Sequence, residues 1–430
     1  MKIAVIAGGG MGGTEKAAYL FAAELSRRGY EVDALTQADG CRVGSLLEAG
    51  VRIRDIRSEC DEFESYLREA RPDVIHNHTS GYADHRALYH ALDKAGPNRP
   101  RLIETNVFGR LKDAYEGDRV DMRMFVSMAS GCQAFLRPRL DRRDPSPDRH
   151  TVLYNPLPHE AVALESAVKV SRSSLGIPED ACVLVRVGRP GHKWATWECE
   201  AFHRAKASSP KLRLILMEPP DALKQDIAAG RYGDGMHVLE ATSDQEFIDG
   251  LYRLSDVMLH ASRFGESYGY TLAEGMREGM PIISRTTPWA DNAQVELVSH
   301  GQSGLMCGGV SGMAHAIGLL AADDAKRRLM AQEGIERAKL LSDLTRETDL
   351  LEEVLRFVVS GERGERMKAR YDSWMKFMNG GFLEREWNIL ERSEGGRGSY
   401  AASRAHAAYR KARVSITSRI WDLRAKFRSA

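Results

Sequence analysis

Short apolar runs alternate with amphipathic helical patterns along most of this chain, and this alternation constrains the fold more than any other feature. In the first half, strands are expected at 2–7, 31–36, 73–78 and 101–105. A helix is expected at 14–28, and it ends before Gly29, a residue that suits a helix C-terminus. This β-α-β order predicts a parallel sheet with helices on both faces.

A second series of the same kind follows an interruption at "VLYNPLPHE". Asn155-Pro156 and Pro158 exclude a continuous helix there. Beyond it, strands are expected at 181–188, 212–218, 236–240, 256–260 and 280–284. A chain of 430 residues is long enough for two domains. The sequence therefore predicts an α/β protein with one doubly wound, Rossmann-like domain in each half.

Composition excludes several classes of protein. The formal net charge of +1 gives no reason to expect a nucleic-acid-binding protein. No apolar run approaches the ~18 residues of a spanning helix, and the first residues lack the features of a secretory signal. The six cysteines are scattered without a C-x-x-C pair, so neither a disulfide framework nor a zinc site is expected. A reducing cytoplasm fits this pattern.

The opening stretch "AGGGMGGTEKAA" contains a literal G-x-G-x-x-G at 8–13, and it has three interpretations. A dinucleotide site also needs an acid at the end of the second strand. Asp33 has about that spacing but lies inside the expected strand. Only the glycine part of the dinucleotide-binding pattern is therefore clearly present. Glycines also let a ligand approach the backbone, and the helix that begins near Thr14 points free N–H groups at the loop, which favours a phosphate or a hydroxyl-rich ligand. The third interpretation is a tight strand-to-helix turn that binds no ligand.

The segment "HASRFGESYGYTLAEGMREGMPII" carries a more specific pattern. Glu266 and Glu274 would lie ~12 Å apart along a helix, roughly the span from a sugar ring to a ribose across a diphosphate. Glu266 is expected in a Gly-flanked loop and Glu274 in the helix that follows. The backbone N–H groups from Ser267 to Tyr270 then lie at the helix N-terminus, where they suit sugar hydroxyls or phosphate.

Two cations follow a strand end in "RVGRPGHKW", where open α/β sheets bind ligands. Arg189 and Lys193 would neutralise a diphosphate and stabilise it as a leaving group without a metal. Either one alone is more simply explained as a solvated surface charge. Together with Glu266 and Glu274, they favour a site for a nucleotide sugar.

These segments resemble the retaining glycosyltransferases with the GT-B fold, in the large family 4 (glycosyl transferases group 1). The resemblance covers about residues 1–340 and is carried by "GGMGGTEKAA", "PDVIHNH", "LYNPLP", "VGRPGHKW", "SRFGESYGYTLAEGMREGMPIIS" and "VELVSHGQSGLM". It implies two Rossmann-like domains that face a central cleft holding the active site, with C-terminal helices.

The resemblance also implies residue roles. Glu274 would hold the ribose, Glu266 would contact the donor sugar, and Arg189 and Lys193 would bind the diphosphate. The catalytic positions are thus Glu266, Arg189 and Lys193, and the donor-binding positions are Glu274, Gly265, Ser267, Tyr268, Gly269, Tyr270, Gly12 and Gly13. The spacing from Arg189 to Lys193 is one residue shorter than the common form of that loop.

On the acceptor side, Asn106 stands where many family members place a histidine, and an amide cannot act as a base. This favours a front-face mechanism in which the departing phosphate oxygen takes the acceptor proton. His78, at a strand end, is either an acceptor-side residue or a structural one, and a metal site there lacks a third ligand. Glu15 and Glu104 either line the cleft or serve as caps and solvated charges. Thr14 completes the acceptor-side candidates.

The expected domains are 1–157 on the acceptor side and 158–344 for the nucleotide sugar, with helices near 345–378 packing back on the first domain and a basic helical tail at 379–430. Residues 395–430 combine basic side chains with an apolar stripe, which suits an anionic membrane surface. Packing on the protein's own domains or a partner, or a solvated tail, explains it equally well.

The expected activity is metal-independent transfer of a hexose, with retention, from a nucleotide-diphosphate sugar to a hydroxyl acceptor. The acceptor would be a glycan, a lipid-linked glycan or a protein, in polysaccharide or glycoconjugate synthesis. No cofactor and no nucleic-acid partner is expected, and the location would be cytoplasmic, with the tail able to hold the protein at the inner face of the membrane. The alternatives are a sugar-nucleotide hydrolase or epimerase on the same fold, a non-catalytic sugar-nucleotide-binding protein, and a dehydrogenase.

Overall fold

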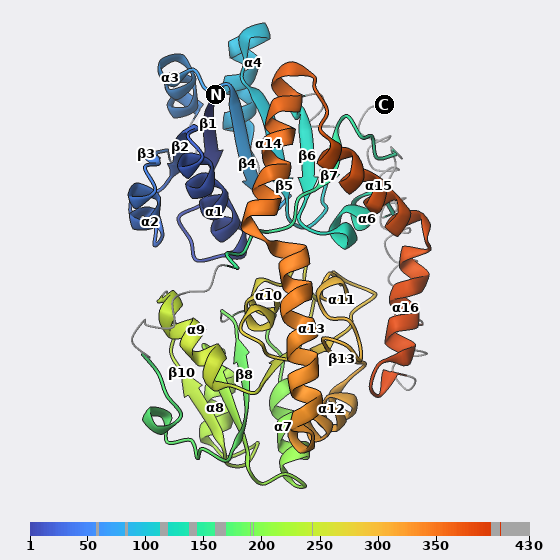
Figure 1. Cartoon of the computed structure of the whole chain (residues 1–430). Coiled ribbons are helices and arrows are strands. Elements are labelled where there is room, and N and C mark those ends of the chain that lie inside the picture. Colours follow the sequence, from blue (N-terminus) through green and yellow to red (C-terminus); the bar gives the residue numbers. More distant parts are fainter. Residues whose placement is uncertain are drawn as a thin grey trace, which may run out of the picture.

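The protein consists of two parallel α/β domains, which lie one above the other in Figure 1. The computed structural model describes residues 1–56, 60–81, 85–111, 119–136, 144–159, 169–189, 191, 193–242, 244–396 and 405. In both sheets every described strand pair is parallel. Strands of this kind are covered on both faces, which explains their nearly continuous apolar runs.

The N-terminal sheet has the strand order β3-β2-β1-β4-β5-β6-β7 within the described residues. Its strands are β1 (Lys2–Ile6), β2 (Glu31–Thr36), β3 (Arg52–Asp55), β4 (Val74–Thr79), β5 (Arg101–Asn106), β6 (Met122–Phe125) and β7 (His150–Val152). Its helices are α1 (Gly13–Arg27), α2 (Val43–Glu48), α3 (Cys60–Ala70), α4 (Arg86–Ala95), the 3₁₀ turn η1 (Gly96–Asn98) and α6 (Met128–Leu136).

The C-terminal sheet has the order β10-β9-β8-β11-β12-β13 within the described residues. Its strands are β8 (Cys182–Val187), β9 (Leu212–Met217), β10 (Met236–Leu239), β11 (Val257–His260), β12 (Ile282–Arg285) and β13 (Gly304–Cys307). Its helices are η3 (Ser173–Leu175), α7 (Trp197–Lys206), α8 (Asp221–Ala228), α9 (Gln245–Leu254), α10 (Tyr270–Arg277), α11 (Gln294–Leu297), α12 (Val310–Ala322) and α13 (Asp324–Ser342).

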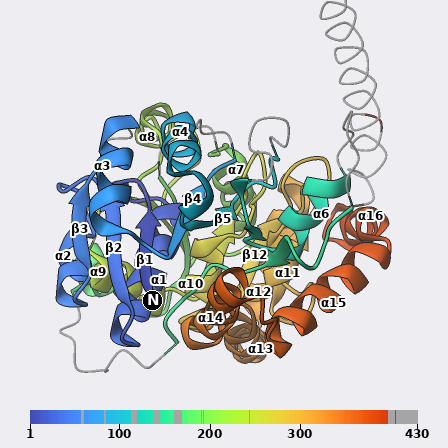
Figure 2. The ribbon, with the colours of Figure 1, turned by 90° about the horizontal axis from the view of Figure 1, so that it is seen from above.

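Three further helices connect the two domains a second time: α14 (Leu344–Ser360), α15 (Glu365–Asn379) and α16 (Phe382–Arg392). Apolar residues of α14 belong to the same buried cluster as β1 and α1, and the Arg28 guanidinium lies 2.8 Å from the Asp349 carboxylate. α15 packs beside β7 and α6, and α16 then runs down to the edge of the other domain (Figures 1 and 2). There the Glu394 N–H donates to the Met306 carbonyl over 2.9 Å. The predicted tail beyond residue 396 lies outside the described residues, apart from residue 405.

The expected strands differ from the observed ones by one or two residues at their ends. β3, β6, β7 and β13 were not expected at all. β3 (RIRD), β6 (MRMF) and β7 (HTV) mix polar and apolar side chains, and β13 (GLMC) begins at a glycine, so none of them forms an apolar run that stands out in the sequence.

Polar contacts connect the domains directly. The Ser127 hydroxyl donates to the Ser267 carbonyl over 2.7 Å. The Glu296 carboxyl, on α11, accepts hydrogen bonds from the Met128 N–H (3.1 Å) and the Ala129 N–H (2.5 Å) at the start of α6. A carboxyl at a helix N-terminus satisfies donors that have no partner within the helix. The relative placement of the domains is therefore held by specific hydrogen bonds as well as by packing.

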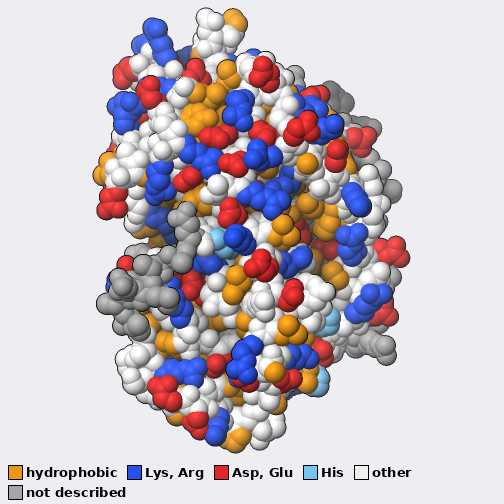
Figure 3. All heavy atoms as spheres, viewed as in Figure 1, with side chains coloured by type: hydrophobic (Ala, Val, Ile, Leu, Met, Phe, Trp, Pro, Cys, Tyr) orange, Lys and Arg blue, Asp and Glu red, His pale blue; other side chains and the backbone are white. Residues whose placement is uncertain are grey.

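The outer surface carries both signs of charge. Basic and acidic side chains are interspersed over the face shown in Figure 3, in keeping with a net charge of +1. Within the described part of the chain, none of the helices has the length and apolar character needed to cross a membrane.

Candidate active site

A cavity of about 670 Å³ lies between the two domains and is lined by residues from both. Its size is within the range of small-ligand sites. The N-terminal domain contributes the loop between β1 and α1. The C-terminal domain contributes residues that follow β8 and β11, at the carboxyl edge of its sheet, where open α/β sheets bind ligands.

The loop between β11 and α10 places Glu266 beside this cavity, and glycines determine its course. Gly265 has φ +68° and Gly269 has φ +102°, a region that side chains with a Cβ rarely adopt. A Cβ on Gly265 would lie 1.5 Å from the Asp291 carbonyl oxygen. The Glu266 N–H donates to Gln294 Oε1 over 3.0 Å. The backbone on both sides of Glu266 is therefore fixed.

Two side chains hold the Glu266 carboxylate. Lys193 Nζ lies 2.7 Å from one oxygen, and His260 Nε2 lies 3.1 Å from the other. Burial disfavours the charged carboxylate, but Lys193 and His260 outweigh it, so the pKa of Glu266 lies well below its ordinary value. Burial lowers the pKa of His260 to about 4. His260 is thus a neutral donor, and Glu266 is a charged, oriented acceptor.

Glu274, on α10, also has two partners. The Tyr252 hydroxyl donates to one carboxylate oxygen over 3.1 Å. The Lys16 ammonium, from α1 of the other domain, donates to the second oxygen and also to Gln245 Oε1 at 3.0 Å. Both side chains of this ion pair are mostly buried. An ion pair therefore bridges the two domains across one wall of the cavity.

The glycine-rich loop faces the other domain at close range. A Cβ on Gly13 would lie 2.9 Å from the Tyr270 ring, and one on Gly12 would lie 3.3 Å from the exposed Arg189 guanidinium. The Tyr270 hydroxyl donates to the Pro156 carbonyl over 2.8 Å. The approach of the two domains therefore requires a glycine at position 13, whereas a Cβ on Gly12 would first meet the Glu15 carboxylate of its own domain.

Most of the predicted donor-side residues meet at this one cavity. Those that line it are Gly12, Gly13, Arg189, Lys193, Glu266, Ser267, Tyr268, Gly269, Tyr270 and Glu274, and the acceptor-side candidate Thr14 lines it as well. Gly265, Glu15, His78 and Asn106 are not among the described residues that line it. Asp33 accepts hydrogen bonds from Arg52 (2.7 Å) and Tyr66 (2.8 Å) inside the N-terminal domain, so it is not placed to hold a ribose.

The remaining acceptor-side candidates lie in the N-terminal sheet. The centroid of the His78 ring lies 4.1 Å from that of His76, with the rings tilted by 38°, and burial holds the pKa of His78 well below its ordinary value. The Asn106 amide donates to Glu104 Oε1 (3.0 Å) and to the Arg110 carbonyl (2.8 Å). Glu104 is itself paired with Arg123 at 2.9 Å. Both ring nitrogens of His78 and one carboxylate oxygen of Glu104 are buried without a hydrogen-bond partner among the described residues.

Glu15 lies over the glycine-rich loop instead of facing the cavity. Its carboxylate is close to the positions that Cβ atoms on Gly8, Gly10 and Gly12 would take. The bare glycines therefore leave room for this acid, which keeps a negative charge at the start of α1.

Sequence reasoning missed three residues at the site: Lys16, Tyr252 and His260. His260 is the last residue of β11, so the rule that ligands bind at strand ends could have found it. Lys16 lies one helical turn after Gly12 and shares its face of α1. Nothing in the sequence around Tyr252 marks it as a site residue, because its partner Glu274 lies on a different helix.

Comparison with known proteins confirms the predicted resemblance. Residues 181–323 match the family described as Glycosyl transferases group 1. The chain is 23% identical over 383 residues to the D-inositol 3-phosphate glycosyltransferase of Corynebacterium glutamicum (strain R), covering 75% of this chain and 86% of the relative.

Solved structures show the same architecture. The Anabaena protein HepE, crystallised with UDP and glucose, superposes with a TM-score of 0.67 at 19% identity, over 83% of this chain and 99% of HepE. A glycosyltransferase from Rickettsia africae ESF-5 gives a TM-score of 0.68 at 13% identity, over 84% and 99%. The protein therefore has the GT-B fold.

Proposed function

We propose that this protein is a retaining glycosyltransferase that moves a hexose from a nucleotide-diphosphate sugar to a hydroxyl acceptor. The observation that carries the proposal is the convergence of Glu266, Lys193, Arg189 and Glu274 on one interdomain cavity, opposite a glycine-rich loop. The similarity to glycosyl transferases group 1 supports the same reaction class.

In this mechanism, the bond between the anomeric carbon and the phosphate oxygen breaks, and a bond to the acceptor oxygen forms on the same face of the sugar. The acceptor proton passes to the departing phosphate oxygen, so no protein base is required. Arg189 and Lys193 stabilise the negative charge that develops on the leaving diphosphate, the part a metal plays in other enzymes. Closure of the two domains that line the cavity excludes the water that would otherwise hydrolyse the donor.

The partners of the two carboxylates indicate what a donor must displace. The Lys193 side chain is 41% exposed, so it can leave Glu266 for a diphosphate at little cost and free one carboxylate oxygen for a sugar hydroxyl. His260 keeps the other oxygen in place. In the same way, a ribose held by Glu274 shares that carboxylate with Lys16 and Tyr252.

A uridine diphosphate sugar is the donor to test first, because HepE has been crystallised with UDP-glucose. The relative named for D-inositol 3-phosphate makes a polyol or sugar hydroxyl a reasonable acceptor class. The reaction would then serve polysaccharide or glycoconjugate synthesis.

A thermal-shift panel of nucleotide sugars tests the proposal. A donor at 100 times its Kd stabilises the protein by about 2.7 kcal/mol, which raises Tm measurably. The responding donor is then assayed for nucleotide release with and without candidate acceptors. Release that depends on an acceptor supports transfer, whereas equal release without one indicates a hydrolase or epimerase. A panel without a responder contradicts the proposal.

A further inference from the structure

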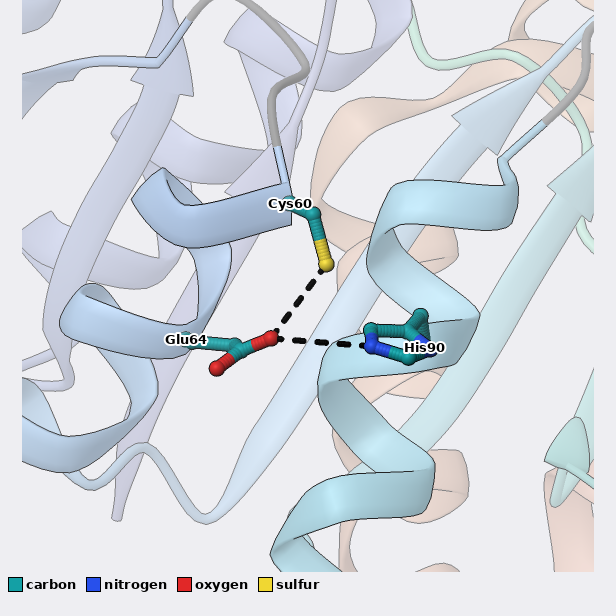
Figure 4. Close-up of side chains that lie close together, drawn as sticks. All are labelled: Cys60, Glu64 and His90. Atoms are coloured by element: carbon teal, nitrogen blue, oxygen red, sulfur yellow. Dashed lines mark hydrogen bonds and ion pairs between the residues drawn. The ribbon is translucent and has the colours of Figure 1, made fainter.

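Three side chains with metal-ligating atoms meet on the outer side of the N-terminal domain (Figure 4). Cys60 and Glu64 lie one turn apart on α3, and His90 projects from the neighbouring helix α4. Cys60 Sγ is 3.3 Å from Glu64 Oε1, and His90 Nε2 is 3.9 Å from the same oxygen. All three ligand atoms lie within 4.8 Å of one another.

We propose that Cys60, Glu64 and His90 form a binding site for a divalent cation of the Zn²⁺ class. A thiolate, an imidazole and a carboxylate are the ligands this class prefers, and a hard cation such as Ca²⁺ or Mg²⁺ would reject the sulfur. With bonds of ~2.0–2.3 Å, ligand atoms of a tetrahedral site stand ~3.4 Å apart. The observed distances of 3.3 and 3.9 Å need only small side-chain rotations. The fourth position is left for water.

Two hydrogen-bond donors, a thiol and an ammonium, interact with the Glu64 carboxylate where the cation would bind. Glu64 Oε1 accepts the Cys60 thiol proton and also the Lys94 ammonium, whose Nζ is 2.7 Å away. In this structure the Cys60 thiol is a hydrogen-bond donor and so carries its proton. Binding releases that proton as the sulfur–metal bond forms, and the half-exposed Lys94 side chain swings into water.

The supporting helices are rigid enough to hold such a site. α3 and α4 pack together through buried side chains of both helices, Phe63, Tyr66, Leu67, Leu88 and Leu92. None of the described residues of α3 or α4 lines the interdomain cavity. A cation here would cross-link two helices and take no part in sugar transfer, so the proposal is independent of the metal-free mechanism above. This site was not expected from the sequence, because zinc sites are recognised there by paired cysteines, and two of these three ligands are not cysteine.

Cobalt titration of the full-length protein tests the site, because Co²⁺ reports its ligands by visible absorption and shows a charge-transfer band when a thiolate binds. We expect one equivalent of Co²⁺ to give both bands and Zn²⁺ to displace them. Cys60→Ser should abolish the charge-transfer band, and His90→Gln should weaken binding more than about 10-fold. Lys94→Met should tighten binding, because it removes the competing ammonium.

The matched control is Cys41→Ser, which removes an exposed thiol elsewhere in the same domain. It should leave the titration unchanged. The proposal is overturned if no charge-transfer band forms, if the band survives in Cys60→Ser, or if it disappears in Cys41→Ser. It is also overturned if Lys94→Met leaves the affinity unchanged. Since all four positions lie outside the cavity, loss of sugar-nucleotide binding would be a separate result.

Discussion

Replacement of Glu266 by glutamine tests the assigned role of this carboxylate most directly. The change keeps the side-chain shape and lets His260 still donate to an oxygen, but it removes the charge. If the carboxylate accepts hydrogen bonds from the donor sugar, the loss is that of a charged hydrogen bond, about 1.5–3 kcal/mol. This corresponds to a fall in kcat/KM of about 10- to 150-fold.

The same substitution should change stability little. The Lys193 side chain that pairs with Glu266 is 41% exposed, so water screens the pair and Lys193 can turn to solvent. Because Glu266 itself is buried, the neutral amide also avoids the desolvation cost of a buried carboxylate, which offsets the lost attraction to Lys193, and Tm should fall by at most a few degrees. Affinity for the nucleoside diphosphate without its sugar should not fall, because Glu266 is assigned to the sugar and its loss frees Lys193 for the diphosphate.

Three measurements therefore separate function from structure: initial rates of nucleotide release, calorimetric affinity for UDP, and Tm. The matched control is Glu278→Gln, which alters a carboxylate that pairs with Arg253 and Arg277 and is not among the described cavity residues. The reasoning is refuted if Glu266→Gln keeps full activity, or if its loss of activity follows a large loss of stability.

Further changes at and near the cavity have distinct expected outcomes. Glu274→Gln should weaken UDP binding by about 10-fold or more in calorimetry, since a charged acceptor for the ribose is lost, and an unchanged affinity would remove Glu274 from the nucleotide site. Gly265→Ala should lower the free energy of unfolding by more than about 2 kcal/mol, because φ +68° is strained for alanine and its Cβ would overlap the Asp291 carbonyl; denaturation at wild-type stability would contradict this. Burial raises the pKa of Glu296 from 4.5 to about 7, so its contribution to stability is complete below about pH 4.5 and is lost as pH rises through 7. The difference in unfolding free energy between wild type and Glu296→Gln should therefore fall with pH by up to about 3 kcal/mol, and a pH-independent difference would show that Glu296 keeps its ordinary pKa.

The sequence alone determined the features that depend on near neighbours in the chain. Alternating apolar runs and helical patterns predicted two parallel α/β domains, because periodicity along a segment decides which face it buries. The spacing of Glu266 and Glu274 around a glycine-rich turn placed one before α10 and the other within it, because a strand end, a turn and a helix start are local events. The strand end before Arg189 likewise placed that residue at the carboxyl edge of the sheet, beside the cavity.

Only the tertiary structure decided which distant side chains meet. Lys16 pairs with Glu274 across 258 residues of chain, and His90 lies beside Glu64 only because α3 and α4 pack together. The acceptor-side role of His78 stays a prediction, and the structure adds that its ring lies 6.3 Å from that of Phe21 on α1, a contact between elements distant in the sequence. The physical reason is that a side chain's partners depend on how helices and strands pack against one another. The periodicity within one segment shows which of its faces is buried, but not which side chains of another segment that face will contact.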